Sequence, residues 1–206
     1  MQRVNVYVDG FNLYYGCLKK TPYKWLNIDQ LCQFLKPKDT TIQQIKYFTA
    51  LVSARANDPG LPVRQQTYLR ALRTIPNLEI IYGHFLTHEV RMANADPPPP
   101  TVRAIKTEEK GSDVNLASHL LVDAFTKQFD MALVITNDSD LYTPIEFVIK
   151  QASLPVGLLN PHKHPSKKLG TIVTFIKQIR EGVLKNSQFP AILTDANGTF
   201  SKPAGW

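Results

Sequence analysis

The chain has 206 residues, of which 43% are hydrophobic and 20% are charged. This composition excludes wholesale disorder, and the length suits one domain with a small appendage. With 24 Lys and Arg against 17 Asp and Glu, the formal net charge is +7, which permits a polyanionic partner without proving one.

The predicted elements alternate between strand and helix. In chain order, we expect a strand at 4–9, a helix at 27–35, a strand at 45–53, a helix at 61–75 and a strand at 78–82. Beyond residue 110 we expect a helix at 113–125, a strand at 131–136, a helix at 143–152 and a last strand at 154–159. This alternation favours an α/β fold with a doubly wound, mainly parallel sheet.

Two segments depart from the alternation. Residues 84–106 contain two strand-like pieces around Asp96 and four consecutive prolines, which cannot lie inside a sheet or helix, so a protruding hairpin or loop is expected. Residues 161–206 are basic and predict an extension with one more helix, packed on a domain formed by residues 1–160. The final residues, 195–206, are expected to be a loop pinned by Trp206.

Cysteine content and the N-terminus indicate the compartment. Two cysteines, Cys17 and Cys32, cannot build a disulfide framework or a usual zinc site. The first residues lack the apolar core and cleavage site of a signal peptide, and no stretch approaches the roughly 18 apolar residues of a membrane span. We therefore expect a cytoplasmic protein that does not enter a membrane.

Aspartates follow two of the predicted strands. Asp9 ends the first strand, where open α/β sheets bind ligands, although an Asp before Gly also initiates turns. Asp138 and Asp140 follow the most apolar strand. Thr143 is expected to cap the next helix, with Pro144 at its first position, so neither aspartate is needed as the cap. Two carboxylates so close together repel each other unless a cation or proton lies between them.

Asp113 begins the helix at 113–125. A helical projection places it near the centre of an apolar stripe, where a carboxylate is costly unless it is paired, protonated or metal-bound. The stripe consists of Val114, Leu116, Ala117, Leu120, Leu121, Ala124 and Phe125. The alternative is an ordinary first-turn aspartate that the helix dipole favours and that faces solvent, preceded by Gly111 and Ser112.

Together these segments predict a cluster of carboxylates at one sheet edge. Carboxylates are hard oxygen ligands that suit Mg²⁺ or Mn²⁺, and one or two such cations can activate water for attack at phosphorus. A basic surface around such a site would hold the backbone of a nucleic acid. The residues expected to do so are Lys110, Lys163, Lys167 and Lys168.

Three motifs resemble the NYN domains of the PIN-like nuclease superfamily, in particular the bacterial LabA-like group. They are VYVDGFNLYYG at 6–16, KGSDVNLASHLL at 110–121 and LVITNDSDLYTPIEF at 133–147. The resemblance implies a PIN-like three-layer α/β/α fold and a metal-dependent ribonuclease, or more general phosphodiesterase. By motif position, the catalytic and metal-binding carboxylates are Asp9, Asp113, Asp138 and Asp140.

The resemblance also gives roles to polar neighbours. Asn12 would brace Asp9 or touch the substrate, while Thr136 and Asn137 hold the small polar position before the acidic pair. Many relatives carry a further Asp where this chain has His119, which puts a second metal and full activity in doubt. We interpret His119 as a solvated surface residue that points away from the apolar stripe, and Asp123 as a candidate to compensate for the missing acid.

The leading hypothesis is therefore a nuclease that uses Mg²⁺ or Mn²⁺ and acts on RNA. One alternative is a catalytically weak or inactive NYN module that binds nucleic acid or a protein partner. A phosphatase of the haloacid-dehalogenase type ranks low, since such enzymes want an Asp where this chain has Phe11. A metal pair at His84 and His88 is disfavoured, and Tyr14 and Tyr15 suit either core packing or base stacking. A homodimer is compatible with the sequence, which does not fix the oligomeric state.

Overall fold

The computed structural model describes all 206 residues and has a six-stranded parallel sheet at its centre, in the order β3-β2-β1-β6-β7-β8. The strands are β1 (Gln2–Asp9), β2 (Thr40–Thr49), β3 (Leu78–Tyr82), β6 (Met131–Ile135), β7 (Val156–Asn160) and β8 (Phe175–Gln178). Every residue of β6 and β7 is buried, as expected for central strands covered on both faces. The predicted parallel α/β fold is confirmed.

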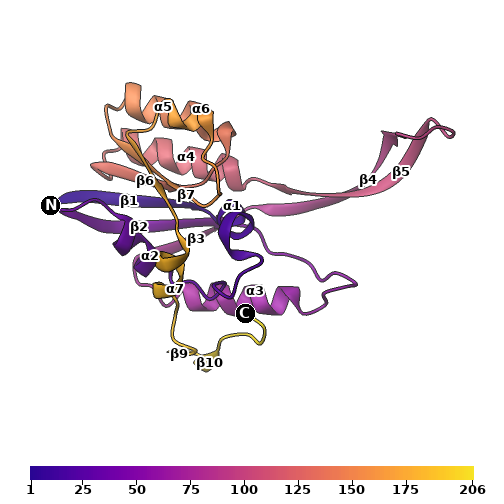
Figure 1. Cartoon of the computed structure of the whole chain (residues 1–206), viewed down its shortest axis with the longest axis horizontal. Helices are drawn as coiled ribbons and strands as arrows, with labels where there is room; N and C mark the ends of the chain where they lie inside the picture. Colours follow the sequence, from indigo (N-terminus) through magenta and orange to yellow (C-terminus); the bar gives the residue numbers. More distant parts are fainter.

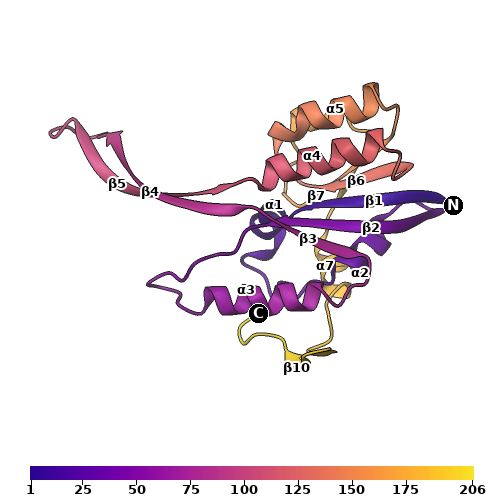
Figure 2. The same ribbon diagram turned by 180° about the vertical axis from the view of Figure 1, so that it is seen from behind.

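Helices cover both faces of the sheet (Figures 1 and 2). On one face lie α4 (Ser112–Phe125), α5 (Tyr142–Lys150) and α6 (Lys167–Gly170), and on the other lie α2 (Ile28–Leu35), α3 (Leu61–Leu72) and α7 (Glu181–Asn186). The alternation of side chains along β1 separates two cores, because Tyr7 packs under α4 while Val4, Val6 and Val8 pack on the opposite face. The result is the expected three-layer α/β/α arrangement.

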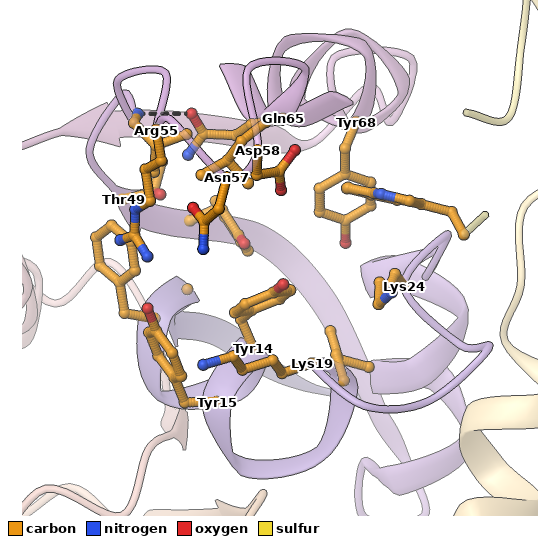
Figure 3. A pocket seen from close by; sticks show the side chains of 17 residues that line it. Tyr14, Tyr15, Lys19, Lys24, Thr49, Arg55, Asn57, Asp58, Gln65 and Tyr68 are labelled. Atoms are coloured by element: carbon orange, nitrogen blue, oxygen red, sulfur yellow. Dashed lines mark hydrogen bonds between the residues drawn. The ribbon is translucent and has the colours of Figure 1, made fainter. Parts of the chain in front are cut away.

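Short helical turns line the edge of the sheet where the strands end. The turn α1 (Gly10–Leu13) follows β1 directly and continues into a π-helical turn, η1 (Tyr14–Leu18). A 3₁₀ turn, η2 (Ser139–Leu141), follows β6 in the same way. A cavity lies between η1 and α3 (Figure 3).

A long hairpin projects from the body of the protein. It consists of β4 (His84–Ala93) and β5 (Thr101–Lys110), which are paired in antiparallel register and pair with no other strand. Figure 1 shows it extending well beyond the helices. The proline-rich segment 94–100 forms its tip, as the predicted protruding hairpin requires.

The C-terminal segment differs from its prediction. The sequence predicts a basic extension after residue 160, yet this segment supplies β8, the sixth strand of the sheet, so the sheet does not end at that boundary. It then forms α7 and a two-stranded hairpin of β9 (Ile192–Asp195) and β10 (Gly198–Ser201). The terminal Trp206 packs on Tyr68 of α3 with ring centroids 5.7 Å apart. No helix of the structure is both long and apolar enough to cross a bilayer.

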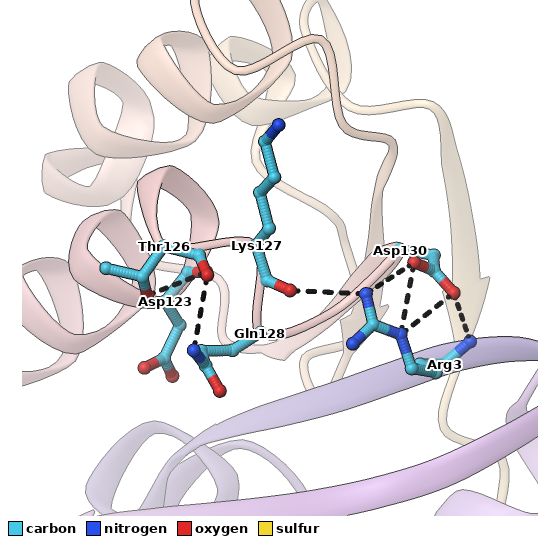
Figure 4. A network of polar contacts seen from close by, with 6 residues as sticks. All are labelled: Arg3, Asp123, Thr126, Lys127, Gln128 and Asp130. Atoms are coloured by element: carbon cyan, nitrogen blue, oxygen red, sulfur yellow. Dashed lines mark hydrogen bonds and ion pairs between the residues drawn. The ribbon is translucent and has the colours of Figure 1, made fainter.

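The start of β1 is fastened to the turn before β6 (Figure 4). The backbone N–H of Arg3 donates to Asp130 Oδ2 at 2.8 Å, and its guanidinium donates to Asp130 Oδ1 at 2.8 Å and to the Lys127 carbonyl at 3.2 Å. These bonds accompany the parallel register that pairs Val8 with Ile135. Asp9 follows Val8 and Thr136 follows Ile135. This register therefore places Asp9 and Thr136 next to each other at the C-terminal ends of β1 and β6.

Candidate metal centre

Asp9 lies at the C-terminal end of β1 and is held by two hydrogen bonds. Its Oδ1 accepts from the backbone N–H of Asn12 at 2.9 Å, so Asp9 also caps α1. Its Oδ2 accepts from the Thr136 hydroxyl at 3.0 Å, and the Thr136 oxygen in turn accepts from the Asp138 N–H at 3.1 Å. Thr136 therefore links the ends of β1 and β6.

Burial and neighbouring charge make the Asp9 carboxylate unusually basic. The residue is 5% exposed, and desolvation raises its pKa from 3.8 to about 6. The hydrogen bonds from Asn12 and Thr136 oppose this shift, whereas the negative charges of Asp113 and Asp138 add to it. A nearby cation would stabilise the ionised form of Asp9, because its attraction would offset both the cost of desolvation and the repulsion by the neighbouring carboxylates.

Asp113 occupies the first turn of α4, on the side that faces the same edge. Gly111 precedes the helix in the left-handed conformation, with φ of 97°. The pKa of Asp113 is raised, first by desolvation and then by the charges of Asp138, Glu109 and Asp140. Asp113 itself is exposed.

The predicted stripe on α4 is only partly correct. Leu116, Leu120 and Ala124 are buried, but Val114 is 68% exposed and Phe125 is 57% exposed. Asp113 lies three and seven residues before Leu116 and Leu120, on their side of α4, but the residue itself is exposed. The alternative of a first-turn aspartate that faces solvent therefore describes Asp113 better than a carboxylate aimed at the core.

Asp138 and Asp140 follow β6, but the expected helix cap is wrong. Asp138 Oδ1 accepts from the Asp140 N–H at 2.9 Å and so caps η2. The helix α5 begins at Tyr142 with no side-chain cap, and Thr143 lies inside it. The capping alternative therefore holds for one oxygen of Asp138, while Asp140 is exposed and caps nothing.

These four carboxylates are close enough to perturb one another, and they fit a divalent cation in kind. In their present orientations, no three histidine, cysteine or carboxylate side chains stand close enough together to hold a metal ion. Asp113 and Asp140 are exposed. The groups that raise the pKa of Asp9 and Asp113 are all carboxylates, and such hard oxygens match Mg²⁺ or Mn²⁺ rather than zinc.

Glu109, which lies outside the predicted set of site residues, adds a fifth carboxylate. It is the last residue but one of β5 and accepts from both the backbone N–H of Ser112, at 3.1 Å, and the Ser112 hydroxyl, at 2.7 Å. Close packing at Gly83, where an added Cβ would lie 2.4 Å from Glu109 Oε1, brings the hairpin base against the start of α4. The position four residues before Asp113 was its only signal in the sequence.

Asn12 and Asn137 brace the loops behind the carboxylates. Asn12 Oδ1 accepts from the Asn137 N–H at 2.9 Å. Asn137 Oδ1 accepts from the Ser166 N–H at 2.6 Å, and its Nδ2 donates to the His164 carbonyl at 3.1 Å. The two amides therefore join α1, the end of β6 and the basic loop before α6 into one rigid edge.

The predicted phosphate-binding lysines divide into two groups. Lys163, Lys167 and Lys168 are exposed on the loop and turn that Asn137 anchors, and none of them forms an ion pair. Lys168 lies over the ring of Tyr142 at 5.2 Å. Lys110 is instead at the base of the hairpin, 3.5 Å from Glu108. The loop at 161–168 therefore provides free positive charge near the carboxylates.

Two predictions about α4 are wrong. His119 is half-buried, not solvated, with Nδ1 3.3 Å from Lys46 Nζ and its ring 5.6 Å from that of Phe48. Asp123 cannot replace the missing acid, because Oδ2 accepts from both Tyr7 and Lys46 at 2.6 Å under the helix. Ten residues along a helix separate Asp123 from Asp113 by about 15 Å. Figure 4 shows Asp123 near the end of α4, beside Thr126.

Comparison with known proteins identifies the family. Residues 3–177 match the NYN domain. The chain belongs to the NYN domain family. This membership fits the parallel sheet and the placement of the acidic motifs at its edge, and it implies a nuclease-like fold. Members of the wider PIN-like group generally use divalent metals, in agreement with the donor chemistry of the carboxylates.

Two relatives of this NYN domain differ in what they indicate. It is 30% identical to 6-hydroxy-3-succinoylpyridine 3-monooxygenase HspA of Pseudomonas putida (strain DSM 28022 / S16) in an alignment of 235 positions, covering 99% of this chain and 75% of that protein. It also resembles the crystal structure of VPA0982 from Vibrio parahaemolyticus RIMD 2210633, a protein of unknown function. The TM-score is 0.58 at 14% identity, over 87% of this chain and 94% of that one, which supports the fold alone.

Proposed function

We propose that this NYN domain is a metal-dependent nuclease that cleaves phosphodiester bonds and that its substrate is RNA. The observation that carries the proposal is that Asp9, Asp113, Asp138 and Asp140 lie near one another at the C-terminal ends of the strands. The negative charges of Asp113 and Asp138 contribute, after burial, to raising the pKa of Asp9 to about 6. Such a set is stabilised by a cation, and the exposed lysines of the loop 161–168 are suited to flanking phosphates.

The chain's own residues have distinct roles in this proposal. Asp9, Asp113, Asp138 and Asp140 would hold Mg²⁺ or Mn²⁺, which supplies a Lewis acid and lowers the pKa of water. Thr136 fixes the rotamer of Asp9 through its 3.0 Å hydrogen bond. The exposed lysines Lys163, Lys167 and Lys168 bind and orient the strand through its phosphates.

The test is cleavage of a labelled RNA by purified protein, with Mg²⁺, Mn²⁺ or EDTA present. We expect Asp9→Asn and Asp138→Asn to lose cleavage at least about a hundredfold while retaining the fold and RNA binding. Asp130→Asn is the matched control, because Asp130 is an aspartate at the opposite edge of the sheet, paired with Arg3, and should cleave like the wild type. Equal cleavage by all three variants would contradict the proposal.

The same assay distinguishes the non-catalytic alternative. Salt-sensitive RNA binding with no turnover in any divalent ion would indicate an NYN module that only binds. His119 bears on this alternative, since it packs against Lys46 and Phe48 and points at the sheet, not at the carboxylates. His119→Asp is therefore expected to place a half-buried acid beside Lys46 without adding a ligand at the sheet edge, leaving cleavage no faster.

A second candidate function is oxygenation of a hydroxypyridine, as the name of the Pseudomonas putida relative states. The observation that favours it is the alignment with that relative over 99% of this chain. Oxygen uptake by the purified protein with 6-hydroxy-3-succinoylpyridine, molecular oxygen and an electron donor would test it. Uptake without RNA cleavage would favour this candidate over the nuclease.

A further inference from the structure

A cavity of about 350 Å³ lies next to the acidic edge, on the opposite face of the sheet from α4. Gly10 and Phe11 line it, so it begins immediately after Asp9 in the chain. Figure 3 shows Tyr14 and Tyr15 on one side of the cavity and Tyr68 on the other. Binding pockets for small molecules span about 300–1,000 Å³, so this cavity suits one ring with a short substituent, not a dinucleotide.

Aromatic rings form the walls of the cavity. Tyr14 and Tyr15 meet edge to face with centroids 5.4 Å apart, while Tyr68 meets Trp206 at 5.7 Å. Tyr15 is 52% exposed, and the Lys19 ammonium lies over its ring, 4.7 Å from the centroid. Planar rings stack on such surfaces, and each stacked base contributes appreciably to binding.

A tyrosine hydroxyl at the floor of the cavity has no hydrogen-bond partner within the protein. Tyr47 as a residue is only 6% exposed, but it lines the cavity, and its hydroxyl is not among the fully buried polar atoms. The neighbouring Tyr68 hydroxyl, by contrast, donates to the Leu26 carbonyl at 2.9 Å. The Tyr47 hydroxyl is therefore accessible from the cavity and available to a polar atom of a ligand.

The charge at the rim is positive. Lys19, Lys24 and Arg55 line the cavity, and none of them forms an ion pair. The one acidic residue of the lining, Asp58, is paired with Arg64 at 2.5 Å. A ligand whose ring lies between the tyrosines would therefore place an anionic group among unpaired cations.

We propose that this pocket binds one planar nitrogen heterocycle that carries an anionic arm. The ring stacks between Tyr14, Tyr15 and Tyr68, a ring heteroatom pairs with the Tyr47 hydroxyl, and the arm contacts the cationic rim. A nucleotide of an RNA strand and a free heteroaromatic acid share this chemistry. The nucleotide source rests on the proposed nuclease function, whereas the pocket itself does not.

The experiment is calorimetric titration of the full chain in EDTA with three probes. They are uridine 5′-monophosphate, nicotinate, and ribose 5-phosphate, which has the anion without the ring. We expect at least one ring-bearing probe to bind about tenfold or more tightly than ribose 5-phosphate, as expected for a stacked ring. Tighter binding of uridine monophosphate identifies a nucleotide site, and tighter binding of nicotinate identifies a site for free acids. Equal binding of all three probes, or none, overturns the proposal.

Two matched tyrosine variants locate the site. Tyr47→Phe removes only the unpartnered hydroxyl and should weaken ring binding about 2–10-fold. Tyr23→Phe removes a hydroxyl that bonds Glu181 outside the pocket, at 2.9 Å, and should bind like the wild type. Circular dichroism and thermal unfolding check that both variants fold. If Tyr47→Phe folds and binds every probe as tightly as Tyr23→Phe, the pocket assignment is wrong.

A second substitution keeps this result separate from the nuclease proposal. Asp138→Asn removes a carboxylate that does not line the cavity and should leave ring binding intact. If Asp138→Asn still cleaves RNA while the ring-bearing probes bind, the nuclease site is wrong and the pocket stands. If Asp138→Asn abolishes cleavage but Tyr47→Phe binds the probes as tightly as Tyr23→Phe, the nuclease stands and the pocket does not.

Discussion

Replacing Asp9 by Asn should stabilise the metal-free protein at neutral pH. Asp9 is 5% exposed, and its pKa of about 6 in the folded protein lies well above the ordinary value of 3.8. Folding therefore disfavours the ionised carboxylate, chiefly through desolvation and then through repulsion by Asp113 and Asp138. A neutral amide of the same size removes this cost and can still accept the capping hydrogen bond from Asn12.

The size of the effect follows from the shift. The difference between 3.8 and about 6 corresponds to roughly 3 kcal/mol at pH 7.5, where Asp9 is ionised in both states. The variant loses the acceptor for the Thr136 hydroxyl, a cost of about 1 kcal/mol. We therefore expect the free energy of unfolding to rise by about 2 kcal/mol.

The gain must depend on pH with a definite sign. A carboxyl whose folded pKa is raised takes up its proton first in the folded state, so the wild type gains stability as pH falls from about 6 towards 3.8. The variant has no such group. The advantage of the variant should therefore shrink through this window, and below pH 4 only the loss of the Thr136 hydrogen bond, about 1 kcal/mol, should remain, now in favour of the wild type.

Urea denaturation in EDTA at pH 7.5, 5 and 4 measures the difference. Asp130→Asn is a control of opposite sign, because Arg3 lowers the pKa of Asp130 and its substitution should destabilise the protein at pH 7.5 and less at low pH. Adding Mn²⁺ should raise the midpoint of the wild type and leave Asp9→Asn unchanged. An Asp9→Asn protein no more stable than the wild type at pH 7.5, or equally stabilised at pH 4, would refute the reasoning.

Two further substitutions, Asp123→Asn and Gly10→Ala, test the packing on the two sides of β1. Each is compared with its own control variant by urea denaturation. Asp123→Asn leaves Lys46 buried without its partner and should cost about 3 kcal/mol or more, whereas Glu89→Gln, which breaks an exposed pair on the hairpin, should cost far less. Gly10→Ala should cost about 1–3 kcal/mol, since its Cβ would lie 2.7 Å from a backbone carbonyl. Gly182→Ala, in open space on α7, should be neutral or stabilising, and equal costs at the two glycines would contradict the steric argument.

Periodicity predicted most of the fold because each signal was local. The β-branched run at 4–9, the apolar run at 131–136 and the four prolines at 97–100 each specify a strand or a break without help from distant residues. Because parallel strands end at the same edge, the placement of Asp9 and Asp138 followed from the strands alone. The start of α5 at Tyr142 did not follow, because Asp138 caps an intervening turn that sequence patterns do not separate from the helix.

The remaining differences depend on contacts between distant residues. Asp123 and His119 were interpreted from their own helix, but their partners, Lys46 and Tyr7, lie on two strands far away in the sequence. A lysine at 46 within a strand gives no local sign that it faces an acid. The cavity likewise combines η1, the end of β2 and α3 with the last residue, Trp206, and only the tertiary fold brings these segments together.

The turn after β1 joins both candidate sites. Asp9 faces α4 and the other carboxylates, whereas Tyr47, on the neighbouring strand, faces the cavity on the opposite side. Gly10 separates them, and an added Cβ there would lie 2.8 Å from the Tyr47 hydroxyl. A side chain at this position would displace the floor of the cavity and the residue that follows Asp9 at once. Gly10 therefore satisfies steric requirements on both faces of the sheet. A residue with a Cβ atom at this position would collide with the Phe48 carbonyl and the Tyr47 ring.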